Sequence, residues 1–210
     1  SSDLVDAVKA TGTTYFSAAG NFANKSYENN FNPIAAPGGL PGSAHNFGGG
    51  DVFQNVTLSP GNYTIVLQWI DDIYSLGQTS AGGTKNDLDI YLTPNTNGTA
   101  LFGFNRNNIN GDPIEILPFT VTSTVNTNIL ITNNTVGSNP ARFKYIVFQG
   151  NIAINEFATG SSTLVGQANA LGAIAVGAVR YDKAAPFAGP LSVESFSSVG
   201  GTFINNEIGR

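Results

Sequence analysis

The chain lacks two residue types altogether. It has no cysteine among its 210 residues, which excludes disulfide bonds and thiolate metal sites. It has no methionine either, not even an initiator, and it starts at Ser1 and stops at Arg210. We therefore expect it to be an excised or processed piece of a longer protein.

Charge and long apolar runs are also scarce. Only 11% of the residues are charged, well below the usual quarter. The nine Lys and Arg residues form no cluster and the formal net charge is −5, which argues against a nucleic-acid or anionic-membrane partner. No apolar run approaches the roughly 20 residues of a membrane span. Gly, Asn, Thr and Ser are plentiful instead, a balance typical of turn-rich β-structure on a secreted or cell-surface protein of bacterial type.

Regularly spaced strand patterns fill the middle of the chain. Residues 63–70 read YTIVLQWI, which is typical of a strand, and similar patterns follow between turn clusters rich in Gly, Asn and Pro. We expect an antiparallel β-sandwich of the jelly-roll type, preceded by a loop over residues 22–50, where periodicity is absent. The other strands are expected at residues 52–58, 88–92, 101–104, 114–121, 128–132 and 143–148.

The two ends of the chain have a different character. Residues 3–10 predict a helix and residues 13–19 a buried strand. After Ser161, small residues predict a short helix around residues 168–173 and then a fully buried strand over residues 173–179. Such near-continuous apolar strands belong to parallel sheets that are covered on both faces. We therefore expect a mainly β chain, in which residues 1–21 and 158–210 form a partial α/β core and residues 22–157 an inserted β-domain.

The segment Ala18-Ala19-Gly20-Asn21 ends the first expected strand. A strand that stops in a tight turn can hold an Asn amide in a fixed direction. Such an amide can donate a hydrogen bond to the oxyanion that develops in acyl transfer. The four residues also fit a plain strand end and turn. What favours the first interpretation is a second stretch, which reads SSTLVGQANALGAIAVGAV at residues 161–179 and SVESFSSVG at residues 192–200.

Together these segments resemble the subtilisin-like serine proteases (peptidase S8). The resemblance covers residues 1–21 and about 160–205, in the family's order. It implies that Asn21 is the oxyanion-hole residue, that Ala18, Ala19 and Gly20 form a wall of the substrate pocket, and that Gly166 falls near the pocket floor.

The same resemblance implies where the catalytic triad lies. The family's Asp and His should precede Ser1, and the nucleophilic Ser should follow Arg210, because no Gly-Thr-Ser motif is present. The chain by itself is then inactive. The partner of the whole enzyme would be a protein or peptide substrate.

Acidic residues mark a candidate metal site in the middle of the chain. Asp71 and Asp72 end one expected strand, and Asp87 and Asp89 start another. The period of two puts Asp87 and Asp89 on one face of their strand, about 7 Å apart. If Asp71 or Asp72 comes alongside, the oxygen-rich cluster suits a structural Ca²⁺ better than Zn²⁺. Two further acidic residues at another strand start, Asp112 and Glu115, are weaker candidates.

The surroundings of these carboxylates resemble a second family. A Trp-x-Asp segment followed by NDLDIYL is similar to the jelly-roll accessory domains of secreted bacterial proteases, the pre-peptidase C-terminal and P-type domains. The resemblance covers about residues 50–150 and implies structural calcium at such positions. Solvated aspartates at the start of a strand are the simpler interpretation, and the sequence leaves it open.

The only histidine, His45, follows Asn21, which is the wrong order for a subtilisin-like base. No other His or Cys can join it in a metal site, so we expect a loop histidine with local hydrogen bonds. Two functions stay open. The chain is either the central segment of a secreted endopeptidase with an accessory β-domain at the rim of its cleft, or a non-catalytic β-sandwich module that recognises protein or glycan.

Overall fold

The computed structural model describes residues 2–76, 82–184, 186 and 190–201. The chain divides into two compact units. Unit 1 is made of Ser1–Ser26 and Gly160–Arg210, and unit 2 of Tyr27–Thr159. The fold is mainly β.

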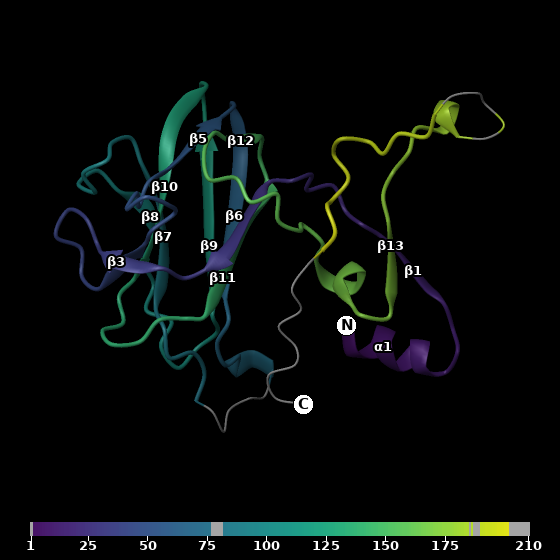
Figure 1. The fold of residues 1–210 in the computed structure, drawn as a ribbon, viewed down its shortest axis with the longest axis horizontal. Helices are drawn as coiled ribbons and strands as arrows, with labels where there is room; N and C mark the ends of the chain where they lie inside the picture. Colours follow the sequence, from purple (N-terminus) through teal and green to yellow (C-terminus); the bar gives the residue numbers. More distant parts are fainter. Residues whose placement is uncertain (1, 77–81, 185, 187–189, 202–210) are drawn as a thin grey trace. The chain divides into compact units, whose positions relative to one another are not determined.

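Unit 2 is built around two antiparallel sheets (Figure 1). The first sheet has the order β2-β11-β6-β9. The second has the order β12-β5-β10-β4-β3, with β7 also pairing with β10, and β8 with β7. The strands are β2 (Ser26–Asn30), β3 (Pro33–Ala35), β4 (Ser43–His45), β5 (Gln54–Leu58), β6 (Gly61–Trp69), β7 (Leu88–Thr93), β8 (Phe102–Phe104), β9 (Ile114–Val121), β10 (Val125–Asn133), β11 (Arg142–Gln149) and β12 (Ile152–Ile154), and a 3₁₀ turn η1 covers Tyr74–Leu76.

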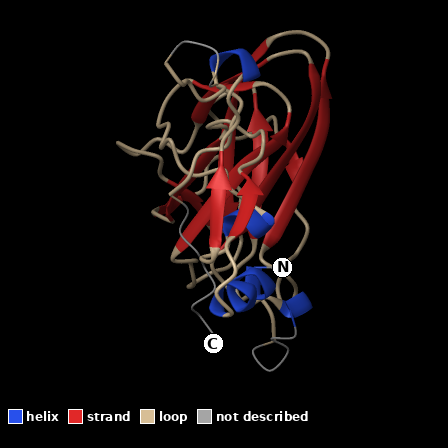
Figure 2. Ribbon diagram, turned by 90° about the vertical axis from the view of Figure 1, so that its right-hand side faces the viewer, coloured by secondary structure: helices blue, strands red, loops and turns tan. Residues whose placement is uncertain are grey.

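One apolar core fills the space between the two sheets. In β6, every second side chain from Tyr63 to Trp69 is buried, as the alternation predicted. The same core takes Leu88, Ile90 and Leu92 of β7, on the second sheet. Figure 2 shows the strands of the unit in red. The expectation of antiparallel β-structure in the middle of the chain is confirmed.

The loop expected over residues 22–50 is wrong, because the strands β2, β3 and β4 lie within it. These strands are only three to five residues long. They are stabilised by pairing with distant partners, as β4 pairs with the far end of β10. His45 is fully buried because of this pairing, and no local periodicity in the sequence predicts its burial. The strand β12 was missed for the same reason.

The first and last residues of unit 2 lie close together. The backbone N–H of Glu28 donates a hydrogen bond to Thr159 Oγ1 at 3.3 Å. The chain therefore enters and leaves unit 2 at nearly the same point.

Unit 1 is small and contains a two-stranded parallel sheet. The strands β1 (Tyr15–Ala18) and β13 (Ala173–Val176) pair in parallel and run side by side in Figure 1. The helix α1 (Ser2–Ala10) precedes them, and the 3₁₀ turns η3 (Gly166–Asn169) and η4 (Tyr181–Lys183) flank β13. Among the described residues, no helix has the length and apolar character that a membrane span requires.

Three expectations for unit 1 are corrected. The buried strand expected over residues 13–19 is the shorter β1, whose side chains are half-buried or exposed, with Phe16 65% exposed. The short helix around residues 168–173 is a single 3₁₀ turn that ends at Asn169. The strand over residues 173–179 ends earlier and is not fully buried, because Ile174 and Val176 remain 46% and 50% exposed. The helix α1 and the turn η3 contact β1 and β13, but they leave these side chains half-exposed, whereas parallel sheets are usually covered on both faces.

Candidate functional site

Asn21 sits in the turn that ends the parallel sheet of unit 1. The backbone N–H of Ala19 donates to Val176 O at 2.9 Å, which extends the pairing one residue beyond β1. Gly20 then adopts a positive φ of 96°, which favours glycine. The side chain of Asn21 is exposed and makes no hydrogen bond with any described residue. Its amide is therefore free to donate to a ligand.

A distant segment holds this turn on both sides of Asn21. The backbone N–H of Ser198 donates to Gly20 O at 2.9 Å, and the backbone N–H of Phe22 donates to Ser198 Oγ at 3.1 Å. One further residue along, the Ala23 N–H donates to Phe196 O at 3.0 Å. The backbone that carries Asn21 is thus fixed by the SFSS segment, residues 195–198. This segment contributed to the family resemblance, but its role in holding the turn was not predicted.

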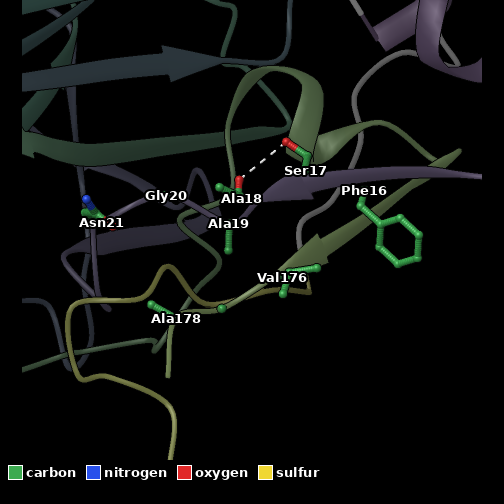
Figure 3. A pocket seen from close by; sticks show the side chains of 9 residues that line it. Phe16, Ser17, Ala18, Ala19, Gly20, Asn21, Val176 and Ala178 are labelled. Atoms are coloured by element: carbon green, nitrogen blue, oxygen red, sulfur yellow. Dashed lines mark hydrogen bonds between the residues drawn. The ribbon is translucent and has the colours of Figure 1, made fainter. Parts of the chain in front are cut away.

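A pocket of about 360 Å³ lies beside the turn. Figure 3 shows Asn21 at one end and Phe16 at the other, with Ala19, Val176 and Ala178 between them. Most lining side chains are small, which leaves room for a ligand side chain of moderate size. The residues that line the pocket are Phe16, Ser17, Ala18, Ala19, Gly20, Asn21, Val176, Gly177 and Ala178.

The structure thus brings four of the five predicted residues of this site together. Asn21, Ala18, Ala19 and Gly20 all line the pocket. Gly166 does not, and instead begins the 3₁₀ turn η3 with a φ of 58°.

His45 belongs to the core of unit 2 and to a strand, not to a loop. The Asn32 backbone N–H donates to its Nδ1 at 3.1 Å, so Nε2 carries the proton and faces Tyr27 Oη at 2.9 Å. Burial lowers the pKa of His45 to about 4. The ring is therefore neutral near pH 7, and its hydrogen bonds are local, as expected.

Asp71 is engaged in organising its own loop. Its Oδ2 accepts hydrogen bonds from Thr84 Oγ1 at 2.7 Å and from Asn86 Nδ2 at 2.8 Å, and the backbone N–H of Lys85 adds a third at 2.9 Å. Burial acts to raise the pKa of Asp71, but these hydrogen bonds hold it below its ordinary value. Asp72 is half-buried next to it.

The acidic residues in β7 and β9 and directly before β7 are buried more deeply. Asp87, Asp89 and Glu115 expose 8%, 0% and 0% of their surface. Burial, with a smaller effect of the Asp87 charge, raises the pKa of Asp89 to about 7. Burial also raises the pKa of Glu115 to about 7; Arg106 opposes this rise, and the charges of Asp89 and Asp87 add to it.

Solvated aspartates are thus excluded for Asp87 and Asp89. In the part of the chain that the structure describes, no three acidic or histidine side chains already form a metal-ligand group.

Neither comparison with known proteins identifies the chain: no protein-family model matches it, and no curated protein matches it. Its function is argued below from its own residues.

Proposed function

We propose that this chain is the central segment of a secreted or cell-surface subtilisin-like serine endopeptidase, whose catalytic Asp, His and Ser lie outside residues 1–210. Asn21 would be its oxyanion donor. The observation that carries the proposal is the free amide of Asn21, on a backbone fixed on both sides by Ser198 and at the end of a pocket with small lining residues.

Peptide hydrolysis by a serine nucleophile requires a hydrogen-bond donor for the oxyanion. Peptide hydrolysis by a serine nucleophile passes through a tetrahedral intermediate whose oxygen carries negative charge. An amide held in place before the reaction stabilises that charge without reorganising. The backbone on both sides of Asn21 is held by hydrogen bonds, and its side-chain amide has no internal partner, so the amide is available to donate to such an oxygen. The pocket walled by Ala18, Ala19 and Gly20 would take a substrate side chain.

Unit 2 would be a jelly-roll accessory domain inserted after the oxyanion turn. Its antiparallel sheets and the apolar core between them support that assignment. The close approach of its two ends, Glu28 and Thr159, supports an insertion, because a host core tolerates a long excursion when the ends return together. Such a domain would restrict access to the cleft or hold large substrates.

The test is Asn21→Ala in the full-length protein. We expect kcat to fall by about 10²–10³-fold with KM nearly unchanged, because the lost hydrogen bond forms only in the transition state. Labelling with a fluorophosphonate, which reacts with an activated serine, counts the active sites in each preparation.

Asn24→Ala is the matched control, because Asn24 is an exposed Asn three residues further along. Equal losses in the two variants would remove Asn21 from the mechanism. A full-length protein that takes no label and cleaves no peptide would overturn the protease proposal. The alternative, a β-sandwich that binds protein or glycan, would then be tested on unit 2.

A further inference from the structure

The chain carries a short motif that the proposed function does not use, the N-glycosylation sequon Asn-x-Ser/Thr. In a secreted protein this motif marks a candidate acceptor asparagine, which must lie on the surface because a glycan is bulky and hydrophilic. The structure separates the sequons of this chain by the exposure of the asparagine, the hydrogen bonds of its amide and the place of the Ser or Thr hydroxyl. The five sequons start at Asn24, Asn55, Asn62, Asn97 and Asn133.

Two of the sequons lie inside the second sheet of unit 2. Asn133, at the end of β10, is fully buried, and its Nδ2 donates to Ser138 O at 2.7 Å. Asn55 lies in β5 between β12 and β10, and its Nδ2 donates to Asn128 Oδ1 at 3.2 Å. A glycan on either amide nitrogen would replace a hydrogen bond of the fold, and the buried Asn133 leaves no space for one. These two sequons are therefore closed in the folded chain.

Two other sequons have an exposed asparagine but a hydroxyl that an enzyme cannot easily reach. Asn24 is exposed, but Ser26 of its sequon is 1% exposed, and the Ser26 Oγ donates to Ser161 O at 2.8 Å. Asn62 is exposed at the start of β6, where pairing with β9 holds its sequon in an extended strand. Its Thr64 is half-buried, and the two side chains are roughly 7 Å apart along the strand.

The sequon of Asn97 lies in the connection between β7 and β8, and both Asn97 and Thr99 are exposed. Thr99 Oγ1 donates to Asn97 Oδ1 at 2.7 Å, and the Thr99 backbone N–H donates to the same oxygen at 3.1 Å. Gly98 between them has a φ of 70°, which favours glycine in this tight turn. The Asn97 Nδ2 makes no hydrogen bond with any described residue. The acceptor nitrogen is thus free, and the sequon hydroxyl lies beside the amide.

The turn is fixed from its other side. The Asn97 backbone N–H donates to Asn95 Oδ1 at 3.3 Å. Gly98 is buried against Pro37, since a Cβ at Gly98 would lie 3.1 Å from Pro37 Cγ. The backbone of the turn therefore makes the contacts with the fold, whereas the side chains of Asn97 and Thr99 face solvent. A glycan on Asn97 Nδ2 would displace no contact of unit 2.

We propose that Asn97 is N-glycosylated and that the other four sequons stay unmodified. The donor is a lipid-linked oligosaccharide, and the enzyme is an oligosaccharyltransferase. A bond forms between Asn97 Nδ2 and C1 of the first sugar, and the bond between C1 and the lipid diphosphate breaks. The diphosphate leaves with the electron pair, and the amide nitrogen loses one proton. The proposal rests on the secreted or cell-surface location given under the proposed function, but not on peptide cleavage.

The test uses the folded chain, purified without glycan, so its outcome does not depend on protease activity. The chain is incubated with a lipid-linked oligosaccharide and a single-subunit oligosaccharyltransferase that glycosylates free peptides of residues 58–66 and 93–101, which contain the sequons of Asn62 and Asn97. We expect intact-mass measurement to show one glycan per chain, and peptide mapping to place it on Asn97. A chain that stays unmodified, or a glycan on Asn62 or another sequon, would overturn the proposal.

Variants of the same chain assign the acceptor. Asn97→Gln and Thr99→Val should each lose the glycan, whereas Thr99→Ser keeps the hydroxyl and should keep the glycan. Asn62→Gln is the matched control, because it makes the same change at an exposed asparagine of another sequon, and it should be glycosylated like the wild type. Because all these residues lie at the surface of unit 2, Tm should change little in any of them. Glycosylation that survives in Asn97→Gln would place the acceptor elsewhere and overturn the assignment.

Discussion

The two units differ in how completely they bury their own apolar residues. In unit 2, Ile65, Leu67 and Ile129 are fully buried between two sheets. In unit 1, Phe16, Ile174 and Val176 on a two-stranded sheet are 46–65% exposed. The large apolar core therefore belongs to unit 2, whereas the candidate oxyanion donor, Asn21, belongs to unit 1. Unit 2 holds its shape by core packing, whereas the Asn21 turn is held by a few backbone hydrogen bonds.

Substitutions of apolar residues should give the largest difference between the two units in the free energy of unfolding. Ile65→Ala leaves a cavity in a fully packed core, and we expect it to lower the free energy of unfolding by about 2–5 kcal/mol. Val176→Ala removes half-exposed methyl groups and should cost less than about 1 kcal/mol. Urea unfolding followed by Trp69, the only tryptophan and a core residue of unit 2, measures the first change. Far-UV circular dichroism measures the second. Similar losses in the two variants would contradict the comparison.

The buried ionisable groups of unit 2 should make its stability depend on pH. The pKa of His45 is lowered to about 4, so the unfolded chain binds more protons between pH 4 and 6.5. This contribution, about 3 kcal/mol, is lost as pH falls through that window. The pKa values of Asp89 and Glu115 are raised to about 7, so their contributions are lost as pH rises from about 4 to 7.

As pH rises, the carboxyl groups of Asp89 and Glu115 lower the stability of unit 2, whereas His45 raises it. The two carboxyl groups outweigh the one imidazole, so we expect a net loss of stability. Tm of the wild type should fall as pH rises from 5 to 7. The fall should shrink in Glu115→Gln and reverse in the double variant with Asp89→Asn, because His45 then dominates. Differential scanning calorimetry at several pH values measures this. A profile that is the same in wild type and Glu115→Gln would contradict the raised pKa of Glu115.

The smallest effect is expected at the turn of unit 1. Ser198→Ala removes the oxygen that accepts from the Phe22 N–H, a hydrogen bond worth about 1 kcal/mol. In the full-length enzyme we expect kcat to fall by about 3- to 10-fold with KM unchanged, because the amide of Asn21 is less well fixed. Ser198→Thr keeps the hydroxyl and should restore kcat. Ser195→Ala, at an exposed serine of the same segment, is the control, and an equal loss there would contradict a positioning role.

Sequence patterns were most reliable where burial alternates along a strand. The strands β6, β9 and β11 could be predicted because every second residue faces one core. The strands β3 and β4 could not, because their burial comes from partners elsewhere in the chain.

The candidate sites show the same division. A Gly-Asn turn after a strand predicted where Asn21 lies. The hydrogen bond that holds this turn, however, joins Phe22 to Ser198, which is 176 residues away in the sequence. Asp87 and Asp89 could be placed on one strand, whereas Glu115 was ranked low. Its burial depends on the meeting of β9 with the segment after β8, which no local pattern reveals.

The contact between Glu28 and Thr159 also changes the entropy of the whole chain. A flexible loop of more than a hundred residues would impose a closure cost of roughly 4 kcal/mol on the sheet that β1 and β13 form. A folded unit whose ends already meet removes part of that cost. To the strands of unit 1, the connection is then shortened to the segments on either side of the domain, residues 19–26 and 160–172.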